Sequence, residues 1–317
     1  MERSHQPGDI IGDRYRIVGL LGEGGSGATY EVQDLQSKSR QALKALSLKG
    51  ISDWKALELF EREAKVLASL EHTAIPSYLD YFHIDSPTNR AFYIAQELAP
   101  GESLAALVSS GWRANEQEAR RIAREILEIL VYLHSLTPAV IHRDIKPQNI
   151  IRAQDGRIFL VDFGAVRQSQ YTTMARGSTV VGTFGYMAPE QFIGQAVEGT
   201  DLYGLGATLL FLLTHRSPAD LPVERLKINF RDRVEVSGSF ADWLEKMLEP
   251  DIEERFSSAK EALSALRGEG KIVAAKTSAL PWKATYASST CSRRKSATYD
   301  VWASLRKNTT KRPISMS

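Results

Sequence analysis

Hydrophobic residues follow two different spacings along the chain. Before Pro100, short apolar and β-branched runs alternate with glycine-rich or polar turns, a pattern typical of strands. A helical spacing interrupts them, because apolar residues from Leu57 to Leu70 recur every three or four positions. The pattern predicts strands over residues 15–21, 28–32, 41–46, 77–83 and 91–98.

From Gly101 to Gly268 the spacing is mostly helical. Apolar residues from Ala119 to Leu133 form one face of a long helix. The apolar run 202–213 predicts a buried helix, with Asp201 placed to cap its N-terminus, and further helices are predicted over 240–248 and 258–266. Strands followed by helices indicate an α+β protein of two lobes, joined near residues 97–101.

Charge and composition separate a tail from this body. From Lys271 onward the chain carries ten Lys and Arg residues and one acid, Asp300, whereas residues 1–270 carry 30 basic and 37 acidic residues. Large aliphatic residues are sparse in the tail, which predicts little independent structure, although Trp282 and Trp302 lie in it. The predicted parts are an N-terminal segment (1–14), the two lobes (15–98 and 99–268) and a basic, Ser/Thr-rich, poorly ordered tail (269–317).

The basic clusters of the tail, 292–296 and 306–307, allow contact with nucleic acid or anionic lipid. A solvated tail is the favoured interpretation, because runs of like charge usually lie in water.

Three features indicate a soluble cytoplasmic protein. The single cysteine, Cys291, excludes an intrachain disulfide and fits a reducing cytosol. The first fifteen residues contain no apolar stretch of the kind found in signal peptides. The longest apolar run, 202–213, is too short to span a bilayer and predicts no transmembrane segment.

A glycine cluster and a lysine suggest a phosphate site in the strand-rich part. Residues 22–27 read GEGGSG, and glycines let backbone N–H groups approach phosphates closely. A strand follows the cluster, whereas a dinucleotide-binding fingerprint needs a helix there. Taken alone, the cluster is better explained by an ordinary glycine-rich hairpin. Lys44 lies on the next predicted strand among apolar neighbours and requires either an anion or an exposed strand face.

The helix from Leu57 supplies the candidate partner for Lys44. At about 100° per residue, Glu63 falls on the apolar side of this helix, Glu61 falls at its edge and Glu58 lies outside it. An acid on the buried face needs a buried cation, so the pattern predicts a pair between Lys44 and Glu63.

The densest chemical signal is HRDIKPQN at residues 142–149. An aspartate that accepts a hydroxyl proton, a lysine two residues later and an asparagine five residues later can surround one phosphoryl site. Pro147 prevents the loop from continuing as a helix. A predicted strand over 157–161 then ends in DFG at 162–164, and a carboxylate at a strand end is suited to Mg²⁺.

The order and spacing of these motifs resemble those of eukaryotic-like bacterial serine/threonine protein kinases, over about residues 10–267. The resemblance implies a two-lobed fold with an antiparallel sheet and one helix in the N-lobe and a mainly helical C-lobe. It also implies ATP and Mg²⁺ as cofactors and protein serine or threonine hydroxyls as acceptors. For ATP it implies Gly22, Gly24 and Gly27 over the phosphates, Lys44 on the α- and β-phosphates and paired with Glu63, and Thr29, Ala42, Gln96, Glu97 and Ala99 around the adenine. For transfer it implies Asp144 as base or orienter, Lys146 on the γ-phosphoryl group, and Asn149 and Asp162 on Mg²⁺.

Further residues match the family outside the centre. Residues 182–190, GTFGYMAPE, resemble the end of an activation segment, with Thr183 expected beside Asp144. A structural pair between Glu190 and Arg255 is predicted, with Asp201 bracing the catalytic loop.

Regulation by phosphorylation is predicted within residues 165–181. A phosphate there would bring negative charge to Arg143 and order the segment. Among the hydroxyls Thr172, Thr173, Ser178 and Thr179, the first choice is Thr179.

Two departures from the family and two rival functions stay open. Thr29 replaces the usual valine above the adenine, and residues 217–239 show little helical pattern. A pseudokinase that only binds nucleotide is one rival, although Lys44, Asp144, Asn149 and Asp162 are all present. A kinase of small molecules such as aminoglycosides is the other.

Overall fold

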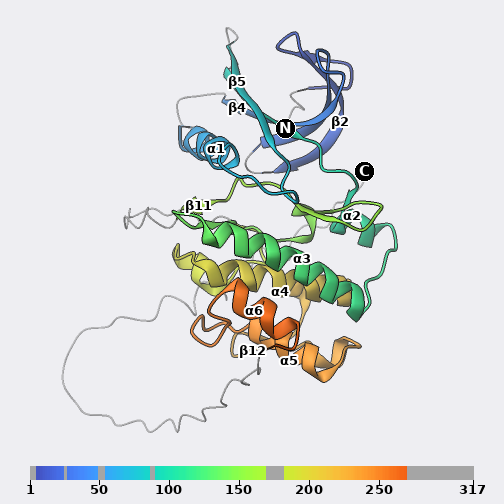
Figure 1. Ribbon diagram of the computed structural model, residues 1–317, viewed down its shortest axis with the longest axis vertical. Coiled ribbons are helices and arrows are strands. Elements are labelled where there is room, and N and C mark those ends of the chain that lie inside the picture. Colours follow the sequence, from blue (N-terminus) through green and yellow to red (C-terminus); the bar gives the residue numbers. More distant parts are fainter. Residues whose placement is uncertain (1–4, 25–26, 49–53, 86–89, 169–181, 270–317) are drawn as a thin grey trace, which may run out of the picture. The chain divides into compact units, whose positions relative to one another are not determined.

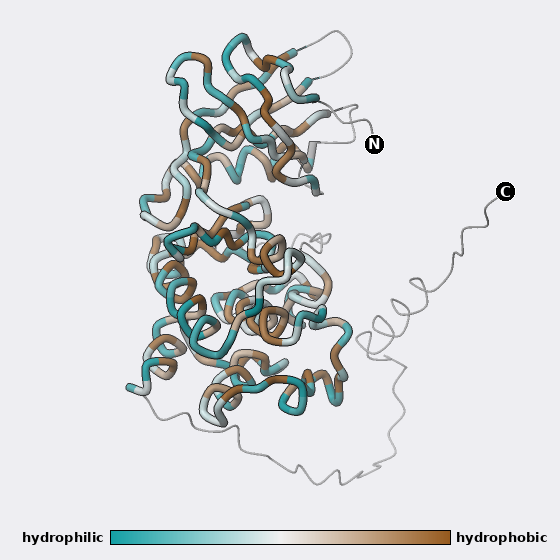
Figure 2. The backbone as a smooth tube through the Cα atoms, turned by 90° about the vertical axis from the view of Figure 1, so that its right-hand side faces the viewer, coloured by the Kyte–Doolittle hydropathy of each residue, from teal (hydrophilic) through white to brown (hydrophobic). Residues whose placement is uncertain are grey.

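The computed structural model describes residues 5–24, 27–48, 54–85, 90–168 and 182–269. The chain divides into two compact units, Met1–Ala275 and Lys276–Ser317, and all described residues belong to the first. Figure 1 shows this unit as a strand-rich part and a helical part. Figure 2 shows that hydrophobic stretches recur in both parts.

A six-stranded antiparallel sheet forms the N-lobe, in the order β1-β2-β3-β4-β6-β5. Its strands are β1 (Ile10–Ile11), β2 (Tyr15–Gly24), β3 (Gly27–Asp34), β4 (Arg40–Leu48), β5 (Tyr78–Asp85) and β6 (Arg90–Glu97). Alternate side chains of β2, β3 and β4 point to opposite faces. One set, including Ile17, Val32 and Leu43, forms a small core of its own.

Helix α1 (Trp54–Leu67) packs on the sheet with Leu57, Phe60, Ala64 and Leu67 buried. These are the apolar positions whose spacing predicted the helix. This packing fixes the face on which Glu63 lies, and Glu63 is 2% exposed.

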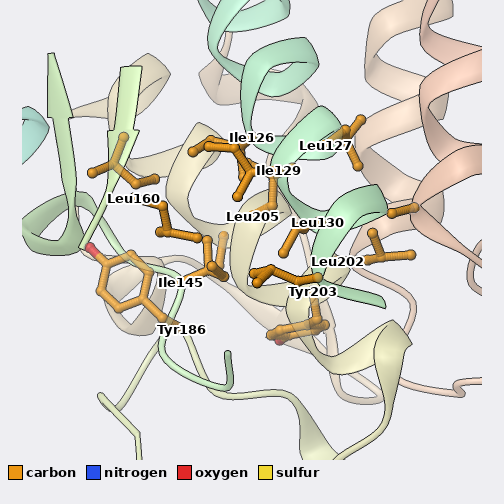
Figure 3. Packing of buried hydrophobic residues seen from close by; sticks show 14 of the residues in the cluster. Ile126, Leu127, Ile129, Leu130, Ile145, Leu160, Tyr186, Leu202, Tyr203 and Leu205 are labelled. Atoms are coloured by element: carbon orange, nitrogen blue, oxygen red, sulfur yellow. The ribbon is translucent and has the colours of Figure 1, made fainter. Parts of the chain in front are cut away.

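The helical C-lobe is organised around α4 (Glu198–Thr214). Thirteen of its residues are buried, so this helix is apolar on nearly every side. Figure 3 shows Leu202, Tyr203 and Leu205 of α4 among side chains of α3. The other helices are α2 (Leu104–Ser109), α3 (Glu116–Ser135), α5 (Gly238–Met247) and α6 (Ala259–Leu266).

Very short strands position the loops between the lobes. Strand β9 pairs with both β10 and β7, and β8 pairs with β11, all antiparallel. Their bounds are β7 (Glu102–Ser103), β8 (Val140–Ile141), β9 (Ile150–Arg152), β10 (Ile158–Leu160) and β11 (Arg167–Gln168). Residues 142–149 connect β8 to β9, and Asp162 comes two residues after β10.

The predicted α+β fold is confirmed, and the five N-lobe strands and four C-lobe helices predicted from spacing occur within a few residues of their expected ends. The prediction that Asp201 caps α4 is wrong. The helix begins at Glu198, with Val197 before it, so Asp201 lies inside the first turn. The segment 217–239 contains short 3-10 turns, a hairpin of β12 (Val223–Glu224) and β13 (Lys227–Ile228) and, at its end, the first two residues of α5, as its weak helical pattern indicated. No helix in the described part of the chain is both long and apolar enough to cross a membrane.

Candidate active site

Three charged side chains meet between the lobes. The Lys44 Nζ atom lies 2.7 and 2.8 Å from the two carboxylate oxygens of Glu63, and 2.7 Å from Asp162 Oδ1. The predicted pair between Lys44 and Glu63 is therefore confirmed. Lys44 comes from β4, Glu63 from α1 and Asp162 from the loop after β10, so this contact joins the two lobes.

The environment keeps Lys44 and Asp162 ionised. Burial disfavours the charged form of Lys44, but the carboxylates of Glu63 and Asp162 more than offset this and raise its pKa. Burial alone would raise the pKa of Asp162, but the Lys44 ammonium lowers it to about 2. At neutral pH the site thus holds the Lys44 cation on β4 beside the Asp162 anion.

The loop at 142–149 is held from α4. The buried carboxylate of Asp201 accepts hydrogen bonds from the backbone N–H groups of His142, at 2.9 Å, and Arg143, at 2.7 Å. Arg143 has a φ of 69°, a left-handed conformation that is strained for a non-glycine residue. The bracing role predicted for Asp201 is confirmed, and it explains how the loop keeps this conformation.

Three polar side chains surround the Asp144 carboxylate. Asp144 Oδ1 accepts a hydrogen bond from the Thr183 hydroxyl at 3.2 Å, and Oδ2 accepts one from Asn149 Nδ2 at 3.1 Å. Lys146 Nζ lies 2.6 Å from Asp144 Oδ2 and 2.8 Å from the Thr183 hydroxyl. Thr183 thus lies beside Asp144, as predicted.

Asp162 and Asn149 are suited to Mg²⁺. The backbone N–H of Val161 donates to the Asn149 carbonyl at 2.9 Å, which places Asn149 next to the residue preceding Asp162. Asn149 uses its amide N–H₂ on Asp144 and keeps its amide oxygen as an acceptor. In the described residues, no cluster of three or more His, Cys, Asp or Glu side chains could hold a metal. Mg²⁺ commonly binds through one or two protein oxygens together with substrate phosphates, so these two residues fit it.

Strands β2 and β3 bring the predicted glycines together, with Gly22 opposite Thr29 and Gly24 opposite Gly27. Gly27 has a φ of +119°, and a Cβ atom there would lie 2.2 Å from the Ala45 carbonyl oxygen. A larger residue at this position is therefore incompatible with the sheet. Strands β4 and β6 place Ala42 opposite Gln96 at the edge leading to the segment 97–101.

Comparison with known proteins decides the family. The protein kinase domain family matches residues 15–266. The chain belongs to the protein kinase family. It is 36% identical to serine/threonine-protein kinase B of Synechocystis sp. over 81% of the chain, and 37% identical to kinase F of the same organism over 82%. It is also 36% identical to serine/threonine-protein kinase PknA of Nostoc sp. over 81% of the chain. The chain covers 46%, 56% and 48% of these relatives, about half of their length.

A buried ion pair in the kinase C-lobe joins Glu190 to Arg255. Arg255 Nη1 and Nη2 lie 2.7 and 2.8 Å from the carboxylate oxygens of Glu190, and Arg255 also donates to the Gly199 carbonyl at 3.0 Å. The predicted pair is confirmed. Because Gly199 lies in α4, the pair links the end of the activation segment to the central helix.

Sequence reasoning missed Gln191 and His134. Gln191 Nε2 donates to the Arg143 carbonyl at 2.9 Å, and its Oε1 accepts the Ala188 N–H, so it holds the segment after Met187 against the catalytic loop. His134 Nε2 lies 3.0 Å from Asp201. No motif or spacing in the sequence indicates either contact.

Some predictions fall outside the described residues. These are the phosphorylation candidates at 172, 173, 178 and 179 and the basic tail from 270 onward.

Proposed function

We propose that the chain is an ATP-dependent protein serine/threonine kinase that transfers the γ-phosphoryl group to hydroxyls of other proteins. The proposal rests on one observation above all. The Asp144 carboxylate faces the Thr183 hydroxyl and the Lys146 ammonium, and Asn149 fixes its second oxygen. A substrate hydroxyl that displaces Thr183 from Asp144 would occupy the same acceptor position.

The residues act by alignment and charge neutralisation. Phosphoryl transfer passes through a loose transition state, so it needs positioned groups more than covalent chemistry. Asp144 orients the incoming hydroxyl and accepts its proton, while Lys146 stabilises the charge on the transferred group. Lys44, held by Glu63, binds the α- and β-phosphates. Mg²⁺, when bound by Asn149 and Asp162, neutralises phosphate charge.

The nucleotide would lie between the glycine strands and the segment 97–101. Gly22, Gly24 and Gly27 would cover the phosphates with backbone N–H groups. The residues proposed around the adenine are Thr29, Ala42, Gln96, Glu97 and Ala99. Thr29 adds a hydroxyl to the roof of this pocket.

Transfer of labelled phosphate from Mg-ATP to a generic basic protein tests the proposal, with Asp144→Asn as the control. A positioned general base contributes about 10²- to 10⁴-fold, so the variant is expected to lose at least about 100-fold in kcat. Its thermal stabilisation by Mg-ATP should persist, because Asp144 contacts the acceptor and not the nucleotide. Loss of ATP binding at an unchanged melting temperature would contradict this role.

The same assay separates the rivals. The assay is repeated after the protein has been phosphorylated by an active kinase. If the phosphorylated protein then binds Mg-ATP but transfers no phosphate to any protein, a nucleotide-binding pseudokinase is favoured. Faster phosphorylation of an aminoglycoside or sugar than of protein would favour a small-molecule kinase. Phosphoserine or phosphothreonine formed by the wild type and not by Asp144→Asn would support the proposal.

We further propose that a phosphate between residues 165 and 181, first of all on Thr179, activates the kinase. A phosphate carries about −1.5 to −2 charges at neutral pH and can form charge-assisted hydrogen bonds with a guanidinium. Arg143, next to Asp144, is the candidate partner. Mass spectrometry of active protein should find the modification, and full activity of protein without phosphate in this segment would contradict the proposal. The cytoplasmic location inferred from the sequence stays a prediction.

A further inference from the structure

A cavity of about 620 Å³ adjoins residues 97–100, the segment that joins the two lobes. Its polar lining includes Ser39 and Arg40, where β4 begins, and its apolar lining includes Ile75 and Leu79. No residue of this cavity takes part in the proposed phosphoryl transfer through its side chain, so the cavity needs an explanation of its own.

The cavity and the proposed nucleotide site lie on opposite faces of strand β4. Neighbouring residues of a strand point to opposite faces, so Gln41 lies on the face opposite to Ala42 and Lys44. Gln41 lines the cavity, whereas Lys44 lies in the candidate active site. A ligand in the cavity would therefore contact residues 97–100 from the side opposite to the proposed adenine position.

Gln41 places a buried acceptor without a donor at this cavity. The residue is 6% exposed, and its Nε2 donates to Ser39 Oγ at 3.0 Å and to Asp34 Oδ2 at 3.4 Å. The hydrogen bond from Arg14 keeps the pKa of Asp34 well below its usual range, so this carboxylate is ionised and only accepts. The amide nitrogen of Gln41 must therefore face Asp34. Its Oε1 is left buried with no hydrogen-bond partner among the described residues, a cost that a donor on a ligand would remove.

Glu97 provides a second acceptor beside Gln41. The two residues are opposite each other in the pairing of β4 with β6, so their side chains lie on the same face, with Cβ atoms about 4.5–5.5 Å apart. Glu97 Oε2 accepts hydrogen bonds from the Ser77 N–H at 3.2 Å and from the Ser77 hydroxyl at 2.9 Å. A carboxylate has two oxygens with several acceptor positions, so Glu97 can accept further N–H groups.

The charges around the cavity favour a cation. Arg14 lies 3.0 Å from Asp34, and Arg40 lies 2.7 Å from Glu31, so both guanidinium groups are already neutralised. Glu97, by contrast, forms no salt bridge with any residue that the structure describes. One carboxylate of the lining thus stays without a counter-ion.

A β-bulge brings an apolar side chain to the same cavity. Tyr78 pairs with Gln96 and Asp80 pairs with Ala95, so Leu79 is an extra residue without a partner on β6. Leu79 is 43% exposed and lines the cavity. Bulges of this kind redirect a side chain and are frequent next to functional sites.

We propose that this cavity binds a free small molecule that carries an amidinium or guanidinium group on an apolar body. The planar N–H groups of such a cation would bridge Gln41 Oε1 and the Glu97 carboxylate, while its apolar body lies against Leu79. The occupant is a small molecule because the volume falls within the range of about 300–1,000 Å³ that is typical of such sites.

Benzamidine, an amidinium on an aromatic ring, is the probe, and benzamide is its neutral analogue. Calorimetric titration of the full chain should give a dissociation constant for benzamidine of about 1 mM or tighter, and benzamide should bind at least about tenfold more weakly. Glu97→Gln removes the carboxylate charge, and Gln41→Met removes the buried acceptor. Each variant should weaken benzamidine binding at least about tenfold, the effect of losing one hydrogen bond to a charged group. Glu58→Gln, which removes an exposed carboxylate from α1, should keep the wild-type affinity.

The proposal is overturned if the wild type does not bind benzamidine, if benzamide binds equally well, or if a folded variant at either position keeps the wild-type affinity. The exposed position of Glu97 keeps the test decisive even if Gln41→Met does not fold. Binding that saturating Mg-ATP abolishes would place benzamidine in the nucleotide site and would also overturn the proposal. Because the readout is binding and not phosphate transfer, the result is independent of the proposed kinase activity.

Discussion

The pair between Glu190 and Arg255 allows a quantitative test of a structural role close to the active site. The Arg255 side chain is 0% exposed and that of Glu190 is 11% exposed. Glu190→Gln removes the negative charge while keeping the shape of the side chain, so it leaves the Arg255 cation buried without its counter-ion. Breaking a buried pair in this way costs about 3–5 kcal/mol.

An exposed pair provides the matched control. Arg62 lies 3.0 Å from Glu58 on the surface of α1, where their side chains are 32% and 69% exposed. Exposed pairs of this kind contribute about 0.2–1 kcal/mol, so Glu58→Gln should lower the free energy of unfolding by less than about 1 kcal/mol. The contrast between the two variants measures the effect of burial.

Urea denaturation and thermal melting give the stability, and phosphate transfer at a temperature where the variant is folded gives the activity. A loss of about 3 kcal/mol corresponds to about 6–12 °C in melting temperature for a domain of this size. The variant Glu190→Gln combined with Arg255→Met should recover part of this loss, because the unpaired buried cation is removed. If Glu190→Gln abolished transfer with its stability intact, the pair would belong to the reaction and the structural reasoning would be refuted.

Three further predictions concern the site and its supports. Gly27→Ala should lower both stability and Mg-ATP affinity in thermal-shift measurements, because its Cβ would lie 2.2 Å from the Ala45 carbonyl oxygen; unchanged values would contradict the close approach. Asp201→Asn should reduce the free energy of unfolding by about 2 kcal/mol and also reduce kcat, because it weakens two charge-assisted hydrogen bonds to the loop at 142–149. A variant with the wild-type kcat would show that the loop does not need these two bonds. Burial lowers the pKa of His142 below its ordinary 6.5, so the folded state resists protonation of this side chain. The resulting contribution to the free energy of unfolding is complete above pH 6.5 and is lost as the pH falls through the folded-state pKa. The melting temperature of His142→Gln should therefore fall less between pH 7.5 and 5.5 than that of the wild type, and equal falls would exclude this source.

The sequence predicted what local spacing controls. The apolar face of α1 identified Glu63 among three glutamates, since a helix turns by about 100° per residue and only Glu63 falls on the packed side. The order and spacing of the motifs around Asp144 and Asp162 predicted which residues meet through their resemblance to those of protein kinases. The helical spacing around Glu63 depends only on neighbours within a few residues.

What depended on distant contacts was predicted poorly. Asp201 looked like a helix cap because it directly precedes the apolar run 202–213, whereas α4 begins about one turn earlier, at Glu198. Strands β7, β8 and β11 have only two residues each, too few to show an alternation of apolar and polar side chains. They form by pairing with strands that lie far away in the sequence. The contact of Gln191 with the Arg143 carbonyl crosses 48 residues and leaves no local pattern.

The attachment of the catalytic loop to α4 has a consequence for how the enzyme is made. Asp201 lies 58 and 59 residues beyond the backbone groups that it holds, and Thr208 reaches the Ile145 carbonyl across 63 residues. A ribosome therefore releases the loop well before its support has been synthesised. A nascent chain that ends before α4 already contains Lys44, Asp144 and Asp162, yet its loop has nothing to hold it in the strained conformation. Competence for the proposed phosphoryl transfer is thus acquired late in translation, when the central helix emerges and packs and most of the C-lobe has formed.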